Sequence, residues 1–146
     1  MFGFVVKHLR RLARVPGWPQ FFDAGLMAWT AVFYQGRLAA MQEIESMMMR
    51  QPTMTLGVHR LGGVEFLEAG RELGHLHGNG LLDVRVGGKS AHSLVKEGKA
   101  ELHHVLGESA WVSFWVKSGA DVAMAIELLK LAGVERERIS TAVPVM

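Results

Sequence analysis

The chain of 146 residues contains no cysteine. This absence excludes disulfides, zinc–thiolate sites, iron–sulfur clusters and cysteine nucleophiles, and it is compatible with a reducing compartment. Chemistry in this chain is therefore expected at other side chains, chiefly its seven histidines and its carboxylates.

The chain also has no large excess of positive or of negative charge. The net charge is +2 at neutral pH, which is too little to indicate nucleic-acid binding. The charge is unevenly placed, because the four charged side chains before Asp23 are all cationic: Lys7, Arg10, Arg11 and Arg14. The basic character therefore belongs to the N-terminal arm.

No apolar run is long enough to span a bilayer. The most hydrophobic stretch, residues 21–34, is shorter than the roughly 20 residues that a spanning helix needs, and it contains Asp23. The apolar start of the chain is short, and charges follow it instead of preceding it, which is not typical of a secretory signal. We therefore expect a cytoplasmic protein, with a peripheral membrane location as the alternative.

The spacing of apolar residues divides the chain into three parts. Residues 1–52 form a helical N-terminal arm, with helices expected near residues 4–15, 21–34 and 37–50. Residues 53–133 form the core of strands and helices. Residues 134–146 form a loosely held tail.

Within the core, apolar residues first alternate with a period of two. Four short strands joined by tight turns are expected across residues 53–86, and neighbours joined so closely must be antiparallel. A fifth strand is expected over residues 110–117. The fold class is therefore α+β, a mainly antiparallel sheet of about five strands with helices on one face and a helical arm.

Two helices are expected outside the strands of the core. One covers residues 89–98, with Ser90 as its N-cap. The other begins at Ser118, where Asp121 completes a capping box, and is expected to end at Gly133.

Three segments carry a family likeness. They are HRLGGVEFLEAGRELGHLHGNGLLDVRV (59–86), EGKAELHHVLGESAWVSF (97–114) and DVAMAIELLKL (121–131). They resemble the bacterial and fungal family labelled the luciferase domain, over about His59 to Leu131. The resemblance implies a shared fold and candidate positions, but it implies neither light emission nor a mechanism. The chain departs from the family pattern at Asn79, where the pattern has an aspartate; an amide can coordinate a metal but cannot act as a base.

A His-x-His pair is the main candidate for chemistry. On an extended strand, residues two apart point to the same side, so His75 and His77 project together, in line with Leu73. Such a pair can supply two ligands to a divalent metal, and histidine also exchanges protons near neutral pH. Asp83 lies on the next strand, whereas Glu72 should point away from His75 if its strand is regular.

The pair His103 and His104 is a second candidate. Adjacent residues of an extended segment point to opposite sides, so we expect at most one of them to join His75 and His77. Asn79 lies in a Gly-Asn-Gly turn, whose residues accept the positive φ that tight hairpins require. A serine hydrolase is disfavoured, because no Gly-x-Ser-x-Gly motif is present.

Two functions remain open from the sequence. The first is a small-ligand or metal-binding domain that uses a histidine cluster, with a divalent metal as its cofactor. The second is a non-catalytic interaction protein that forms a homo-oligomer or contacts a membrane surface through residues 1–34. The first predicts converging imidazoles; the second predicts dispersed imidazoles and an exposed apolar patch on the arm.

Overall fold

The computed structural model describes residues 17–142, with side chains as far as residue 139. In chain order, the elements are α2 (Trp18–Phe33), α3 (Gln35–Met49), β1 (Met54–Val58), β2 (Val64–Glu68), β3 (Arg71–Leu76), β4 (Leu81–Arg85), α4 (Gly88–Lys96), β5 (Glu101–His103), β6 (Gly107–Trp115), the 3₁₀ turn η2 (Gly119–Asp121) and α5 (Val122–Ala142). The expected helix near residues 4–15 lies outside the described residues.

The strands form one antiparallel sheet in the order β1-β2-β3-β4-β6-β5. The α+β prediction is therefore confirmed, with six strands instead of about five. The additional strand is β5, whose three residues are too few to produce a readable alternation in the sequence.

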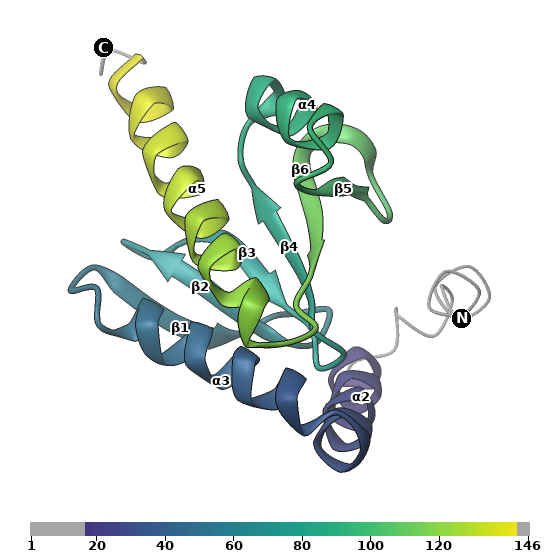
Figure 1. The fold of residues 1–146 in the computed structure, drawn as a ribbon. Helices are drawn as coiled ribbons and strands as arrows, with labels where there is room; N and C mark the ends of the chain where they lie inside the picture. The colour runs from purple at the N-terminus through teal and green to yellow at the C-terminus, as the bar shows by residue number, and fades with distance from the viewer. Residues whose placement is uncertain (1–16, 143–146) are drawn as a thin grey trace.

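One face of the sheet carries the hydrophobic core. Leu82 and Val84 of β4 are fully buried there, together with Val112 of β6 and apolar residues of α3, α4 and α5. Figure 1 shows α3 and α5 lying across this face. Because successive strand residues alternate between faces, Asp83 must lie on the opposite face, where the candidate site is built.

Two predicted helix boundaries are wrong. α5 continues through Gly133 to Ala142, because one helical glycine costs only about 1 kcal/mol and the following residues favour a helix. At Gly133 an added Cβ would lie 3.0 Å from a Glu68 oxygen, so the glycine also permits close packing. In α4 the N-cap is Gly87, not Ser90. The capping box of Ser118 and Asp121 is confirmed.

The Gly-Asn-Gly turn needs its two glycines for different reasons. Gly80 has a φ of 86°, as the hairpin argument predicts. At Gly78, by contrast, an added Cβ would lie 2.6 Å from the carbonyl oxygen of Asp23 and 2.7 Å from the backbone nitrogen of Met27. The turn between β3 and β4 therefore packs directly against the backbone of α2.

None of the helices among residues 17–142 is long and apolar enough to cross a membrane.

Candidate functional site

A polar row runs across three strands on the face opposite the core. His75 of β3 pairs with Asp83 of β4, which pairs with Ser113 of β6. Residues that pair directly across strands share a face, so these three side chains point to the same side. Asp83 is 0% exposed, and it lies between the other two.

An irregularity between β2 and β3 adds a carboxylate to this face. The register shifts between Phe66 and Leu67, so that Leu67 pairs with Glu72 instead of with Leu73. Glu72 thereby turns to the side of His75, and its Oε1 lies 2.6 Å from His75 Nδ1. The prediction that Glu72 points away was wrong because it assumed a regular strand. Leu73 belongs to the hydrophobic core and is not in line with His75.

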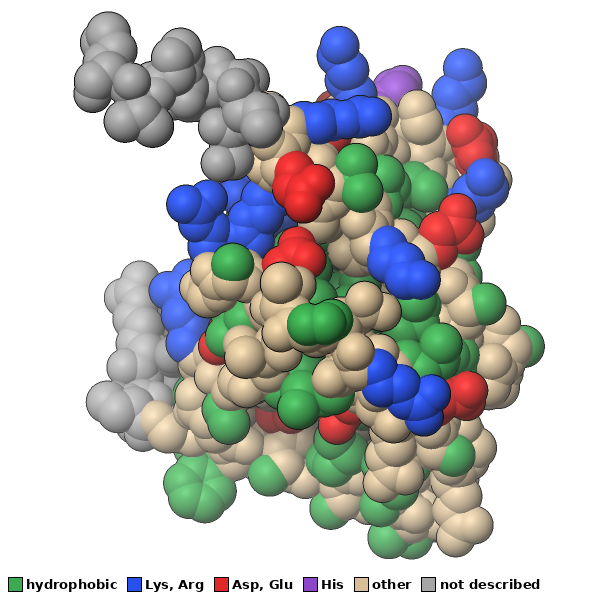
Figure 2. Space-filling model, turned by 90° about the vertical axis from the view of Figure 1, so that its left-hand side faces the viewer, with side chains coloured by type: hydrophobic (Ala, Val, Ile, Leu, Met, Phe, Trp, Pro, Cys, Tyr) green, Lys and Arg blue, Asp and Glu red, His purple; other side chains and the backbone are tan. Residues whose placement is uncertain are grey.

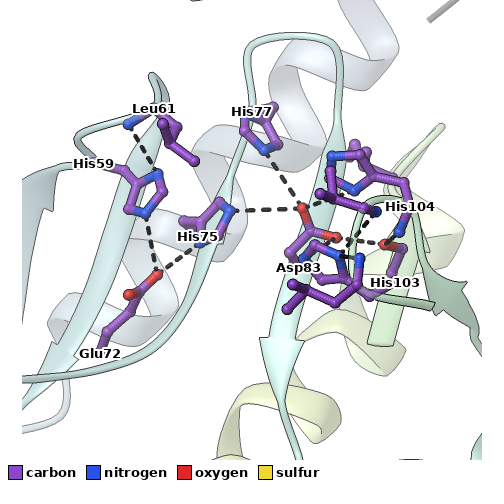
Figure 3. Close-up of polar contacts among 12 residues, drawn as sticks. His59, Leu61, Glu72, His75, His77, Asp83, His103 and His104 are labelled. Atoms are coloured by element: carbon purple, nitrogen blue, oxygen red, sulfur yellow. Dashed lines mark hydrogen bonds and ion pairs between the residues drawn. The ribbon is translucent and has the colours of Figure 1, made fainter. Parts of the chain in front are cut away.

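Asp83 Oδ2 is the point on which three imidazoles converge (Figure 3). It lies 3.3 Å from His104 Nδ1, 3.4 Å from His77 Nε2 and 3.5 Å from His75 Nε2. Hydrogen bonds between charged groups are ordinarily shorter, about 2.7–2.9 Å. Within the described part of the chain, this buried oxygen has no partner at hydrogen-bond geometry.

Both residues of the second histidine pair approach Asp83. His103 ends β5, and His104 lies in the turn that leads into β6, so the two do not follow the alternation of a strand. Their rings stack with centroids 4.7 Å apart, and His103 Nε2 lies 3.8 Å from Asp83 Oδ1. The prediction that only one could join the cluster was therefore wrong.

The outer nitrogens of the His-x-His pair face carboxylates. His75 Nδ1 lies 2.6 Å from Glu72 Oε1, and His77 Nδ1 lies 3.6 Å from Asp23 Oδ1. The same Asp23 oxygen accepts a hydrogen bond of 2.8 Å from the backbone nitrogen of Gly78. Each imidazole thus turns Nε2 toward Asp83 and Nδ1 toward a second carboxylate.

Ser113 fixes the orientation of the central carboxylate. Its hydroxyl donates to Asp83 Oδ1 at 2.5 Å and accepts a bond from the backbone nitrogen of His104 at 3.3 Å. A serine nucleophile would donate to an imidazole base, with the carboxylate behind it. Here the serine donates to the carboxylate itself, so the arrangement is not that of a hydrolytic triad.

His59 extends the cluster at the edge near β1. Its ring stacks on that of His75, with centroids 3.8 Å apart and an angle of 6° between the planes. Its Nδ1 accepts a bond from the backbone nitrogen of Leu61 at 3.4 Å, and its Nε2 lies 3.6 Å from Glu72 Oε1. Five of the seven histidines of the chain therefore lie in one cluster.

The centre of the cluster holds opposite charges. Burial would raise the pKa of the Asp83 carboxyl, but the surrounding imidazoles, His104 foremost, hold this pKa well below its usual range. Burial would lower the pKa of His77, but the neighbouring carboxylates of Asp23 and Asp83 outweigh burial and raise it to about 9. In the metal-free protein, an ionised Asp83 therefore faces a protonated His77 at neutral pH.

The remaining members of the cluster respond differently to burial. The pKa of His75 is raised, because Asp83 and Glu72 overcome the effect of burial. Burial and the neighbouring His75 lower the pKa of His59 to about 4. Burial also lowers the pKa of His103, whose Nδ1 accepts bonds from two backbone nitrogens at 3.1 Å. His59 and His103 are therefore neutral near pH 7.

Asn79 stabilises the hairpin turn between β3 and β4. Its Oδ1 accepts a bond of 3.1 Å from the backbone nitrogen of Leu81, and its backbone oxygen accepts one of 3.0 Å from the Arg37 guanidinium. The structure therefore brings together five of the predicted site residues, His75, His77, Asp83, His103 and His104, and places Asn79 in the adjoining turn.

Two members of the site, Asp23 and Glu72, were not predicted from the sequence. One signal was present for Asp23, which is the single charged residue of an otherwise apolar helix. Its burial indicates a buried polar partner, although no sequence spacing connects it to a histidine 54 residues further along.

The side chains form three overlapping sets that could hold a metal ion. They are His59, Glu72 and His75; His75, His77 and Asp83; and Asp83, His103 and His104. In each set the potential ligand atoms lie within 4.8 Å of one another. The central set is the most buried, and it contains the predicted His75–His77 pair.

Comparison with known proteins supports the family resemblance over part of the chain. A family model described as Luciferase domain matches residues 70–132. This segment contains Glu72, the His-x-His pair, Asp83 and the second histidine pair, but not Asp23 or His59. No curated protein and no solved structure matches the chain significantly.

Proposed function

We propose that this protein is a metal-binding domain that holds one divalent transition-metal ion through His75 Nε2, His77 Nε2 and Asp83 Oδ2. His104 Nδ1 is the next donor, because it approaches the same carboxylate oxygen. Imidazole with carboxylate suits zinc, iron, nickel and copper, whereas magnesium and calcium prefer all-oxygen sites.

The spacing of the donor atoms carries the proposal. Two ligands that each lie 2.0–2.1 Å from a tetrahedral zinc are separated by about 3.4 Å. The three imidazole nitrogens lie 3.3–3.5 Å from Asp83 Oδ2. A network held only by charged hydrogen bonds would draw these atoms about 0.5 Å closer.

The outer contacts of the two ligand imidazoles support the same conclusion. Metal-binding histidines commonly donate their second nitrogen to a carboxylate, which fixes the ring and strengthens the ligand. Glu72 occupies this position for His75, and Asp23 lies on the corresponding side of His77, 3.6 Å from its Nδ1. Ser113 completes the support, because its bond to Oδ1 leaves Oδ2 of Asp83 directed at the imidazoles.

Access to the proposed ion is from the side of His104. The side chains of His75 and His77 are about one-tenth exposed, whereas that of His104 is 23% exposed. Three protein ligands leave at least one coordination position free, and a small molecule could bind there. A position of this kind fits a binding or a catalytic role, and we assign no reaction.

The proposal is tested by the metal content of the chain purified without a histidine tag. We expect about one zinc, iron or nickel ion per chain after exposure to the metal and removal of excess ion. The variant His75→Ala/His77→Ala should retain less than a tenth of this amount. His92→Ala removes an exposed histidine of α4 and is the matched control.

Two results would contradict the proposal. One is a wild-type chain that retains no metal and shows no change of melting temperature when any of these ions is added. The other is equal metal retention by the double variant and the wild type, because the ion would then be held elsewhere.

A further inference from the structure

The exposed face of α2 is apolar along its whole length. Its exposed residues recur at steps of three and four, which places them on one stripe of the helix: Trp18, Phe21, Ala24, Gly25, Ala28, Trp29, Val32 and Phe33. None of them carries a charge. Phe21 is 77% exposed and Val32 is 66% exposed.

The opposite face of α2 carries two buried polar residues beside partly buried apolar side chains such as Met27. Asp23 and Thr30 are the two fully buried residues of this helix. Asp23 binds the backbone of the β3–β4 turn and faces His77. The outward stripe of α2 is therefore apolar, whereas a surface helix usually turns its polar face toward water.

The apolar stripe continues onto the turn between β1 and β2. Gln20 of α2 donates a bond of 2.9 Å to the backbone oxygen of Arg60, and Leu61 beside it is 48% exposed. In Figure 2, charged side chains are spread over the upper part of the surface. The lowest part, at the height of the junction between α2 and α3 in Figure 1, shows hydrophobic and uncharged atoms, and α2 itself lies behind β1 and α3 in this view.

We propose that this face of α2 binds an anionic membrane surface, with the helix lying in the plane of the lipid headgroups. Tryptophan and phenylalanine favour this interface. Charge complementarity points to anionic lipid, because the four charged residues that precede Asp23 in the sequence are all cationic, and Arg60 is exposed next to the start of α2. Each such cation strengthens binding to anionic headgroups.

A second copy of the chain fits this face less well. A helix of 16 residues is about 24 Å long and about 10 Å wide, so the stripe offers roughly 240 Å². Stable protein interfaces bury about 800 Å² on each partner. A membrane surface sets no such threshold, because binding strength grows with the apolar area inserted and with the attraction to anionic lipid.

The test is co-sedimentation of the full-length chain with vesicles. We expect binding to vesicles of phosphatidylcholine with about 30% phosphatidylglycerol, and weaker binding to phosphatidylcholine alone. Phe21→Glu/Trp29→Glu should lower the partition coefficient roughly tenfold or more. A tenfold change corresponds to about 1.4 kcal/mol, and the burial of two aromatic side chains contributes more than this. Neutralisation of the N-terminal cations by Lys7→Ala, Arg10→Ala, Arg11→Ala and Arg14→Ala should abolish the preference for anionic vesicles.

Val134→Glu/Ile139→Glu is the matched control, because it introduces two glutamates at exposed apolar positions of α5. This variant should bind like the wild type. Unchanged far-UV circular dichroism and unchanged melting of all variants show that the fold is retained.

Three outcomes would overturn the proposal. The first is no sedimentation with either vesicle. The second is binding that survives Phe21→Glu/Trp29→Glu. The third is a vesicle-free dimer at micromolar concentration, measured by light scattering, that the same double substitution converts to a monomer, since the face would then be an interface between copies of the chain.

Discussion

The histidine cluster and the outer face of α2 depart from the usual distribution of residues in opposite ways. The cluster buries ionisable groups, and α2 exposes aromatic ones. In the cluster, each buried group faces a partner of opposite charge or a hydrogen-bond donor, so the protein itself compensates for burial. On α2, nothing in residues 17–142 covers the apolar stripe, so its partner is sought outside these residues.

Asp23 connects the two regions. Its carboxylate binds Gly78 and faces His77, so the polar side of α2 must point toward the cluster. The apolar side of the same helix then has to point outward. One buried carboxylate thus both completes the cluster and turns the aromatic stripe outward. Substitutions on the two sides of α2 should therefore have different consequences.

The largest effect is expected from Asp83→Ala. Removal of one member of a buried charge set leaves the others uncompensated, and this typically costs about 3–5 kcal/mol. We expect a loss of this size in the free energy of unfolding, measured by urea denaturation of the metal-free protein, together with complete loss of metal binding. Asp83→Asn keeps the size of the side chain and isolates the role of its charge. Wild-type stability in both variants would contradict the account of the cluster.

Ser113→Ala should have the next largest effect. A hydrogen bond to a charged group contributes about 1.5–3 kcal/mol, and residues that orient metal ligands change metal affinity by about 10–100-fold. We therefore expect both a lower free energy of unfolding and weaker metal binding in calorimetric titrations. Ser109→Ala is the control, because the Ser109 hydroxyl accepts a local bond from the backbone nitrogen of Trp111. Equal metal affinity in the two variants would remove the orienting role of Ser113.

Gly78→Ala tests the contact that joins the two regions. The new methyl group would overlap backbone atoms of α2, and overpacking of this kind costs about 1–3 kcal/mol. The melting temperature should fall, and the displacement of α2 should weaken the contact between Asp23 and His77. Gly88→Ala places a methyl group where no atom lies within 4 Å, and it should leave the melting temperature unchanged. A drop of equal size in both variants would show that α2 is not anchored at Gly78.

The smallest effect on stability is expected from Phe21→Ala. This side chain is mostly exposed, and surface substitutions usually change stability by no more than about 0.5 kcal/mol. The melting temperature should therefore stay within about 2 °C of the wild-type value while vesicle binding decreases. A clear loss of stability with unchanged vesicle binding would mean that Phe21 packs within the protein.

The sequence predicted those parts of the site that follow from the alternation of side chains between the two faces of a strand. His75 and Asp83 lie on one face of the sheet because of this alternation, and they are neighbours because β3 and β4 pair antiparallel. Predictions from this alternation were wrong where the backbone departs from a regular strand. A register shift brought Glu72 to the same side, and a turn brought His104 to Asp83.

Long-range contacts could not be predicted from spacing at all. Asp23 reaches His77 because α2 packs against a hairpin more than 50 residues further along the chain. The hydrophobic run of α2 predicted a helix but not which side of it faces the protein. The apolar residues suggest burial, whereas the contacts of Asp23 with Gly78 and His77 determine the side that faces inward. The fold class itself was predictable, since short turns leave little choice of strand order.

Anomalous diffraction at the zinc absorption edge, from crystals of the untagged protein grown with zinc, would locate the ion bound by the histidine cluster. We expect one strong peak about 2.0–2.2 Å from His75 Nε2, His77 Nε2 and Asp83 Oδ2. The contradicting result is a histidine cluster without a peak at this position, in which the imidazoles have closed onto Asp83 at hydrogen-bond distances of about 2.7–2.9 Å.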